Sequence, residues 1–445
     1  MKVPPAPIGL EYLPFQVDGI NFAVGRSGSL IADEMGLGKT VQAIGVANCT
    51  RPRRVLIVCP ASLRTVWKTE WDKWCCYGAR SHIAARWWPP GIESTDNAPM
   101  AVIASYDRLV VSGTPSIEWD LAIFDEAHYL KSPTTKRTKA VLGSRKSGTG
   151  VQARRKIFLT GTPIVNSLRD ILPIVRVVAM KDLIEVRRMV AWEQTAELNR
   201  YLKSSFMIRR RKEDVLTELP AKRRQLVPLP SAQALTHERR VLHDMMSDMP
   251  HKDAVQKLAR WRMSASQHIM EARHQTALAK VPDAVDHIYD LLDFNEKVVV
   301  FAHHKDVIEK IVAQMPEGTS VLVGETSPTQ RAEAVARFQK HPRCRVFVGS
   351  LMAAGLGLTL TAASTVAFVE LAWTPAAQQQ AEDRLHRIGQ HHPVLVQHLV
   401  VDGSIDSHMS RILIRKQAMM DSAVDGRTED GERNIVDELV AERAA

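Results

Sequence analysis

The chain has 445 residues and a formal net charge of +10, with 59 lysines and arginines against 49 aspartates and glutamates. Its 45% hydrophobic and 24% charged residues exclude a disordered chain, its length predicts two or three domains, and its five cysteines are too few for a disulfide framework. We expect an intracellular protein, cytoplasmic or nucleoid-associated, because no apolar run approaches the ~20 residues of a membrane span and the start lacks an apolar signal core.

Short β-rich apolar runs alternate with helical stretches, which predicts an α/β protein with parallel sheets and crossover helices. The expected strands of the first half are Ser29–Ala32, Arg54–Cys59, Ala101–Ser105, Leu121–Asp125 and Lys156–Thr160. Those of the second half are Lys297–Ala302, Ser320–Val323, Arg345–Gly349, Thr365–Glu370 and Val394–Val400. Each set predicts one open sheet of about five strands. From about residue 166 to 292 the strand signal vanishes, and we expect helical elaborations around a connector.

These elements predict a first lobe over residues 1–205, a connector over 206–225, a helical insertion over 226–292, a second lobe over 293–424 and a tail over 425–445. Within the first lobe, Trp67, Trp71 and Trp74 recur at helical spacing. One helix face carries all three, so we expect them in the core.

A glycine-rich loop follows the first expected strand and opens a helix. Glycines let backbone N–H groups approach phosphate oxygens at the positive end of the helix. Lys39 would reach the β- and γ-phosphates of a nucleotide, and the Thr40 hydroxyl would bind Mg²⁺. The alternative is an ordinary strand–turn–helix, since the GxxxxGK[ST] pattern fails at its first position. The candidate nucleotide-binding residues are Asp33, Glu34, Met35, Gly36, Leu37, Gly38, Lys39 and Thr40.

Two adjacent acids, Asp125 and Glu126, end a later apolar strand. Strand ends are where α/β sheets place ligands. Asp125 would hold Mg²⁺, directly or through water, while Glu126 would orient and deprotonate an attacking water. The alternative is a solvated acidic strand end.

A basic pair lies near the end of the chain, within Gln380–Gln390. Arg384 and Arg387 are three residues apart, and we expect them on one face of a helix. Two arginines so placed could stabilise charge on a transferring phosphoryl group. The alternative is an exposed basic helix that makes salt bridges.

In their order along the chain, the motifs resemble those of superfamily-two helicases, and specifically those of the Swi/Snf-type DNA translocases. The resemblance extends over about residues 13–414. The motif sequences are most similar to those of the annealing-helicase (HARP-like) branch, and we expect no accessory domains. Its motifs are Leu13–Gln16 (Q motif), Asp33–Thr40, Val55–Pro60 (Ia), Asp125–His128 (a DEAH motif II), Leu159–Pro163 (III), Arg209–Val215 (connector), Val299–His304 (IV), Ala354–Thr359 (V) and Gln380–Gln390 (VI).

The resemblance implies two RecA-like parallel-sheet lobes in tandem and a DNA-stimulated hydrolysis of ATP to ADP and phosphate with Mg²⁺. It implies that Gln16 contacts adenine. It also implies that Gln380, Arg384 and Arg387 complete the site from the second lobe, so that hydrolysis depends on lobe closure.

The resemblance further implies a duplex or forked DNA partner, bound mainly through the phosphate backbone, and we expect a monomer. Three alternatives remain open: a strand-separating DNA or RNA helicase with the same core, a catalytically idle DNA-binding scaffold and a P-loop kinase. The candidate DNA contacts are Lys131, Lys136, Arg137, Lys139, Arg145, Lys146, Arg154 and Arg155, with hydrogen bonds from Ala61, Ser62 and Thr359.

Overall fold

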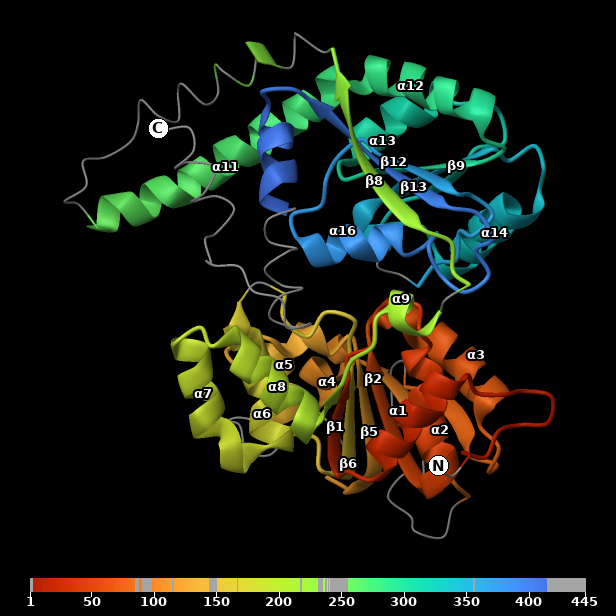
Figure 1. The fold of residues 1–445 in the computed structure, drawn as a ribbon, viewed down its shortest axis with the longest axis vertical. Coiled ribbons are helices and arrows are strands. Elements are labelled where there is room, and N and C mark those ends of the chain that lie inside the picture. The colour runs from red at the N-terminus through yellow and green to blue at the C-terminus, as the bar shows by residue number, and fades with distance from the viewer. Residues whose placement is uncertain are drawn as a thin grey trace. The chain divides into compact units, whose positions relative to one another are not determined.

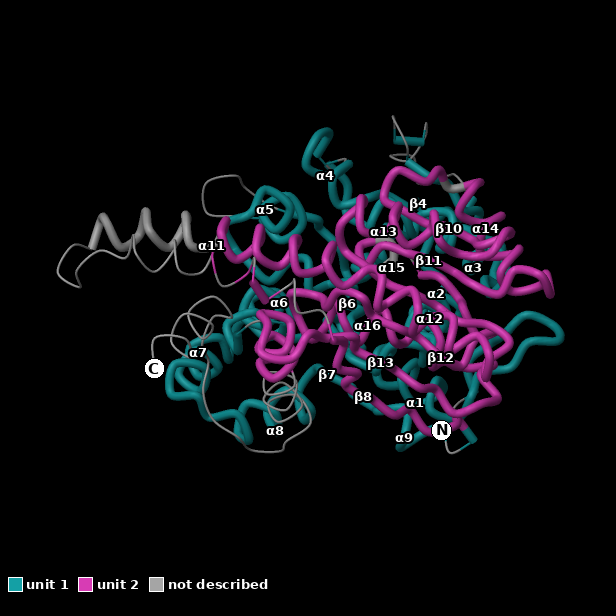
Figure 2. The backbone as a smooth tube through the Cα atoms, turned by 90° about the horizontal axis from the view of Figure 1, so that it is seen from above, with its two compact units in different colours: residues 1–218, 419–429 teal, residues 219–418, 430–445 magenta. Residues whose placement is uncertain are grey.

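The computed structural model describes residues 3–84, 88–89, 98–113, 116–143, 150–165, 167–216, 218–230, 235–236, 238, 240, 255–354 and 357–413. These residues form two compact units that divide between Glu218 and Leu219, within the expected connector (Figures 1 and 2). In the described part of the chain, no helix is both long enough and apolar enough to cross a membrane.

The first unit is built on a seven-stranded sheet in the order β3-β4-β2-β5-β6-β1-β7, with every pair of neighbouring strands parallel. All its strands therefore end at the same edge. The strands are β1 (Gly28–Ile31), β2 (Arg54–Cys59), β3 (Arg80–Ile83), β4 (Met100–Ser105), β5 (Trp119–Asp125), β6 (Ala153–Leu159) and β7 (Met207–Ile208).

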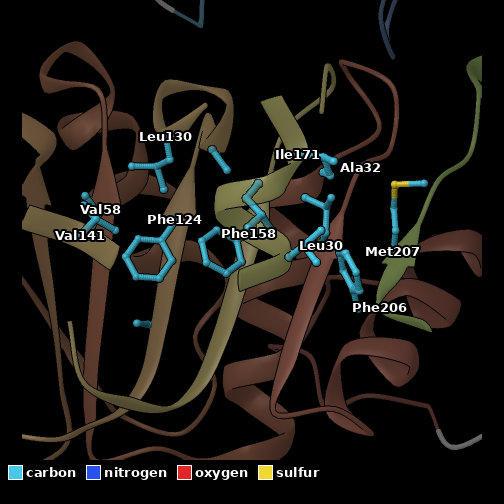
Figure 3. Close-up of a cluster of buried hydrophobic side chains, with 14 of the residues drawn as sticks. Leu30, Ala32, Val58, Phe124, Leu130, Val141, Phe158, Ile171, Phe206 and Met207 are labelled. Atoms are coloured by element: carbon cyan, nitrogen blue, oxygen red, sulfur yellow. The ribbon is translucent and has the colours of Figure 1, made fainter. Parts of the chain in front are cut away.

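Helices cover both faces of this sheet (Figure 1). Along β5, Leu121 and Ile123 pack on the side of α1, α2 and α3, while Ala122 and Phe124 pack on the side of α6, α7 and α8 (Figure 3). This alternation follows from the two-residue period of a strand. The helices are α1 (Pro14–Val24), α2 (Lys39–Thr50), α3 (Arg64–Trp74), α4 (Tyr106–Ser112), α5 (Lys136–Leu142), α6 (Leu172–Val178), α7 (Leu183–Ala191), α8 (Thr195–Ser205) and α9 (Lys212–Val215).

The second unit has a six-stranded parallel sheet in the order β10-β11-β9-β12-β13-β8. One core cluster joins it to α12 and α13, and another joins its other face to α11, α14 and α16. The strands are β8 (Lys222–Leu229), β9 (Val298–Ala302), β10 (Ser320–Leu322), β11 (Val346–Ser350), β12 (Thr365–Phe368) and β13 (Val394–Val401). The helices are α11 (Val255–Ala279), α12 (Val281–Phe294), α13 (Lys305–Val312), α14 (Pro328–Lys340), α15 (Leu351–Ala354) and α16 (Pro375–Glu382).

All ten expected strands are present, and the α/β architecture with two parallel sheets is confirmed. The expectation of no strand between about 166 and 292 is wrong, because β7 and β8 lie there. Together with β3, these unpredicted strands all lie at sheet edges. An edge strand has one exposed side, so it needs no apolar run; β8 begins with four polar residues, Lys222 to Gln225, and most of its residues are exposed.

Candidate nucleotide-binding site

The candidate nucleotide-binding residues of the first unit gather at the carboxyl edge of its sheet. The strands β5, β6 and β1 are neighbours, and Asp125 pairs with Leu159, which in turn pairs with Ile31. The glycine-rich loop leaves the sheet directly after β1, and Glu126 follows β5. Register therefore brings together two motifs that lie far apart in the sequence, as the crevice rule for α/β sheets predicts.

The loop has the backbone that close approach to a phosphate requires. Gly36 and Gly38 have φ angles of 88° and 71°, where a side chain is strained. A Cβ added at Gly38 would also lie 2.5 Å from the Nε2 atom of Gln16. Lys39 begins α2, and its Nζ donates to the carbonyl oxygens of Asp33 at 2.8 Å and Glu34 at 3.3 Å. The ammonium group is thereby held across the loop.

The charge of Lys39 is balanced by the acids around it. Burial lowers the pKa of its ammonium group, and the carboxylates of Glu126, Asp33 and Asp125 oppose that shift. The basic and acidic motifs therefore share one electrostatic environment, as residues serving one anionic ligand and one cation should.

Asp33, which replaces the first glycine of the pattern, directs its carboxylate into the protein. Its side chain is fully buried. One oxygen accepts from the backbone N–H and Nε of Arg210, at 3.1 and 2.9 Å, and the other accepts from Nη2 of Arg210 at 2.5 Å and from Nε2 of Gln42 at 2.8 Å. Only its backbone carbonyl contacts Lys39, so the Asp33 side chain supports the loop from the interior of the protein.

The connector continues this support along the whole start of the loop. Leu30, Ala32 and Glu34 donate in turn to the carbonyls of Phe206, Ile208 and Arg210, so the ladder between β1 and β7 runs on past the strand. In addition, Arg209 donates to the carbonyl oxygens of Ala32 at 2.8 Å and Gly161 at 2.7 Å. The backbone N–H of Lys212 donates to the carboxylate of Glu34 at 2.8 Å. The basic run Arg209–Lys212 thus contacts the residues that lead into and open the phosphate loop.

Asp125 is held by two aromatic side chains. The indole N–H of Trp67 donates to its Oδ2 at 2.7 Å, and the Tyr106 hydroxyl donates to its backbone carbonyl at 2.7 Å. Burial and the neighbouring Glu126 raise the pKa of Asp125 to about 6, while the Trp67 hydrogen bond and Lys39 lower it. Since a carboxyl group binds a metal in its ionised form, these contacts bear on its capacity as a ligand.

Glu126 has a left-handed backbone, with a φ of 50°. Such a conformation costs of order 1–3 kcal/mol in a residue other than glycine and clusters at functional sites. The carboxylate lies 3.2 Å from Nδ1 of His128, which is also 3.3 Å from the Thr160 hydroxyl. The Glu126 carboxylate therefore lies beside His128 at the end of β5, next to Asp125 in the chain.

Gln16 is a buried residue of the first turn of α1. Its Oε1 accepts from the backbone N–H of Leu13 at 3.0 Å, and its Nε2 lies 3.4 Å from the carbonyl oxygen of Leu37 in the phosphate loop. The amide is thus fixed beside the loop. Thr40 follows Lys39 in the first turn of α2, and Met35 packs against Gly161, which begins the expected motif III loop.

The second unit holds the candidate arginines outside a helix. The expectation that Arg384 and Arg387 share one helix face is wrong, because α16 ends at Glu382 and both lie in the turns that follow. The backbone carbonyl of Arg384 accepts from Leu360, and Arg387 donates to the carbonyl of Leu358 and the hydroxyl of Thr359 at 3.1 and 3.0 Å. These bonds to the motif V segment take the place of another helical turn.

The acids of the same motif anchor the edge strand β8. Glu382 is 1% exposed and accepts bidentate hydrogen bonds from Arg224, while Lys222 bridges Glu382 and Asp383 at 3.0 and 3.1 Å. Burial opposes ionisation of Glu382, but the two cations lower its pKa well below the usual range. Gln380, partly buried, precedes this anchor in α16.

The candidate DNA contacts divide between the two edges of the first sheet. Lys136 and Lys139 are exposed on α5, and Arg137 pairs with Asp107 at 3.0 Å. Arg154 and Arg155 lie at the start of β6, at the edge opposite the phosphate loop. Other candidates are placed as follows: Lys131 is half-buried after motif II, Ala61 and Ser62 follow β2, Thr359 contacts Arg387, and Arg145 and Lys146 lie outside the described residues.

Three supporting residues of the site were not predicted. Trp67 is in the core as expected, together with Trp71 and Trp74, but its bond to Asp125 leaves no mark in the sequence. The same holds for Tyr106. Arg210 did leave a signal, because an aspartate in place of a loop glycine requires a cation when it is buried.

Comparisons with known proteins match both units. Residues 15–278 match the SNF2-related domain, and residues 282–389 match the helicase conserved C-terminal domain. The "DNA annealing helicase and endonuclease ZRANB3" of Bos taurus is 34% identical over 96% of this chain and 42% of its own length. The "SWI/SNF-related matrix-associated actin-dependent regulator of chromatin subfamily A-like protein 1" of Xenopus tropicalis is 31% identical over 94% of this chain and 45% of its own.

A solved structure, the "Sulfolobus solfataricus SWI2/SNF2 ATPase core in complex with dsDNA", is 23% identical over 95% of both chains, with a TM-score of 0.44. The chain spans less than half the length of the two curated relatives above. The family assignment rests on the sequence matches, of which the first covers more than half of the chain. The chain belongs to the SNF2-related family of helicase-like proteins.

Proposed function

We propose that this chain hydrolyses ATP to ADP and phosphate with Mg²⁺, that DNA stimulates the reaction, and that hydrolysis drives movement along duplex DNA. The observation that carries the proposal is the convergence of Lys39, Asp125 and Glu126 at one edge of the first sheet, in the register of neighbouring strands. A P-loop kinase would share the loop, but it gives no reason for a second parallel sheet that matches the helicase C-terminal domain.

The residues of the loop fit a nucleoside triphosphate. Left-handed glycines and the first turn of α2 present backbone N–H groups, Lys39 supplies a cation, and Thr40 supplies a hydroxyl oxygen. Gln16 would hydrogen-bond the adenine, since its amide is already fixed beside the loop. Arg210 and Gln42 hold the shape of the loop by donating to the carboxylate of Asp33. An acidic residue is therefore compatible with a phosphate-binding loop, because its charge is paired inside the protein.

The oxygen ligands fit Mg²⁺, which prefers one or two carboxylates with hydroxyl, water and phosphate oxygens. Thr40 and Asp125 would hold it, and the bound ion would neutralise charge on the phosphates. Asp125 ionises for this role, and its indole donor Trp67 favours the ionised form.

Glu126 would act on the attacking water. Its carboxylate lies 3.2 Å from the ring of His128, and it would accept a proton from the water as the water attacks the γ-phosphorus. Arg384 and Arg387 are proposed to stabilise the charge that develops on the transferred group, with Gln380 in the same motif. Hydrolysis would then require the second unit to close on the nucleotide bound by the first.

DNA as the stimulating polymer is supported by the names of the relatives, one of which is a DNA annealing helicase. A net charge of +10 favours a polyanionic partner, and contacts to the phosphate backbone would carry no base preference. Reannealing and strand separation would be distinguished on forked DNA substrates. We propose reannealing, because the name of one relative describes an annealing helicase.

Two variants separate binding from hydrolysis. Lys39→Ala should abolish ATP turnover, because it removes the cation over the phosphates. Arg387→Ala should bind a fluorescent ATP analogue as the wild type does and hydrolyse ATP at a rate lower by about 10³-fold or more, in the range found for arginine fingers. Retained DNA-stimulated turnover in Lys39→Ala would refute the loop assignment. Loss of nucleotide binding by a folded Arg387→Ala would refute the role given to that arginine.

A further inference from the structure

A cavity of about 520 Å³ lies at the edge of the first sheet opposite the phosphate loop. It is lined by the segments that lead into β1 and β2 and by the first residues of β5 and β6, which are neighbouring strands in the order β2-β5-β6-β1. Because the strands are parallel, their amino ends meet at this edge. The cavity is therefore separate from the candidate nucleotide site, which lies beyond the carboxyl ends.

The charge around the cavity is strongly one-sided. Its charged residues are Arg26, Arg51, Arg53, Arg154, Arg155 and Asp120, five arginines against one carboxylate and no lysine. The guanidinium group is planar, stays charged and binds phosphate oxygens in pairs, which a lysine does not do. A concave wall of one sign also concentrates anions from solution.

The fold holds part of this wall rigidly without neutralising it. Arg26 donates to the carbonyl oxygens of Ser205 at 2.9 Å and Phe22 at 3.0 Å, and its guanidinium lies 3.7 Å from the centre of the Phe22 ring. Arg155 donates to the carbonyl oxygens of Ala23, at 2.7 Å, and of Arg26. Carbonyl groups carry no net charge, so both cations keep their full charge toward an anion. Burial lowers the pKa of Arg155, the direction expected of a guanidinium removed from water.

The single carboxylate at the cavity serves the backbone. One oxygen of Asp120 accepts from the N–H groups of Arg53 and Arg54, both at 3.0 Å, and so fixes the turn that carries Arg51 and Arg53. Its other oxygen is 3.6 Å from the guanidinium of Arg154, which also pairs with the exposed Glu118. Asp120 therefore organises the arginine wall more than it cancels it. Exposed Arg51, Arg53 and Arg154 complete a wall that a soluble anion can reach.

We propose that this cavity, the arginine cavity, is a binding site for phosphate groups, distinct from the site of nucleotide hydrolysis. Its volume is larger than one phosphate and accommodates a ligand that bears two or more. Such a ligand is either the backbone of a nucleic acid or a free polyphosphate, and both offer the same oxygens to the arginines.

The test removes the three exposed arginines together and leaves the two that hold carbonyl groups. Arg51 has a φ of 46°, so it is replaced by asparagine, which tolerates the left-handed region; the triple variant is Arg51→Asn, Arg53→Gln, Arg154→Gln. A matched control, the α7 control, removes three exposed charges from α7 and the turn before it: Lys181→Gln, Arg187→Gln, Arg188→Gln. Circular dichroism checks that both fold.

In the first arm, binding of the full chain to a duplex of about 20 base pairs is measured by fluorescence anisotropy over a series of salt concentrations. If DNA is the ligand, the slope of log K against log salt decreases by about 2 to 3 in the triple variant, since each phosphate that is no longer neutralised accounts for about 0.9 of the slope. The slope stays unchanged in the α7 control. In the second arm, pyrophosphate is titrated into Lys39→Ala, so that the nucleotide site is disabled. If free phosphate is the ligand, pyrophosphate raises Tm, and the triple variant in the same background does not show that increase.

Either result supports the site and names its ligand, whether or not the chain hydrolyses ATP. The proposal is overturned if neither arm distinguishes the triple variant from the α7 control. It is also overturned if polyglutamate raises Tm as much as pyrophosphate does, with the same dependence on the three arginines, because the site would then recognise negative charge and not phosphate.

Discussion

The hydrogen-bonded pair of Asp33 and Arg210 makes a strong prediction about stability. Asp33 is fully buried, and the Arg210 side chain is only 13% exposed. Removing one partner of such a pair leaves a buried charge without compensation, which costs about 3–5 kcal/mol. We therefore expect Arg210→Ala to lower the free energy of unfolding by that amount and to weaken ATP binding, since the same arginine fixes the start of the phosphate loop.

The adjacent arginine is the control. Arg211 also pairs with acids, Glu213 and Asp214, but its side chain is 30% exposed and theirs are 68% and 48% exposed. Exposed pairs contribute about 0–1 kcal/mol, so Arg211→Ala should change little. Urea unfolding of the full chain, followed by tryptophan fluorescence, reports mainly on the first unit, which holds most of the nine tryptophans.

A double variant separates the effect of the buried charge from the effect of reduced packing. Arg210→Ala combined with Asp33→Ala leaves no unpaired buried charge, and it should recover part of the stability that the single variant lacks. Equal destabilisation by Arg210→Ala and Arg211→Ala would refute the reasoning. So would a double variant whose loss of unfolding free energy equals the sum of the losses measured for Arg210→Ala and Asp33→Ala separately.

Two further predictions concern Asp125. Because its pKa in the folded chain is raised to about 6, its stabilising contribution is complete below about pH 4 and is lost as the pH rises through about 6; urea unfolding without magnesium should show this decline in the wild type and not in Asp125→Asn. Trp67→Phe removes the indole donor, so the pKa of Asp125 should rise further and the acid limb of the pH–rate profile should move to higher pH. Trp71→Phe, whose indole donates to Ala79 instead, should leave that limb in place, and an equal shift in both variants would contradict the assignment.

The sequence predicted the parts of the fold that rest on apolar periodicity. Buried strands such as β5 and β9 contain continuous apolar runs, Leu121–Phe124 and Val298–Ala302, and their positions in the chain follow from that pattern. The edge strands β3 and β8 escaped because many of their residues are partly or fully exposed, and β7 escaped because it has only two residues. In such strands, pairing with a neighbour decides the conformation more than composition does.

The candidate site divides in the same way. Lys39, Asp125 and Glu126 belong to short local motifs whose chemistry can be recognised from the sequence alone. The helix expected around Arg387 was wrong because hydrogen bonds to a distant segment, Leu358 and Thr359, replaced a helical turn. The role of Trp67 was missed because the packing of α3 against the sheet, which no local sequence pattern records, brings its indole to Asp125.

The arginines show a related limit of charge as a guide to function. Much of the basic run Arg209–Lys212 is used within the protein, on Asp33, Glu34 and nearby carbonyl groups. Arg154 and Arg155, expected with the DNA contacts, line the arginine cavity at the other edge of the sheet. A net charge therefore indicates a class of partner, but only the three-dimensional arrangement of the charges locates the surface that meets it.

The most direct test of the central claim compares ATP turnover by the full chain alone and with single-stranded DNA, duplex DNA, forked DNA and RNA of equal length. We expect duplex and forked DNA to increase the rate in the wild type, and Lys39→Ala to show no turnover with any polymer. A wild-type rate that does not change with DNA, or that rises with RNA alone, would contradict the account of a DNA-stimulated, ATP-driven translocase.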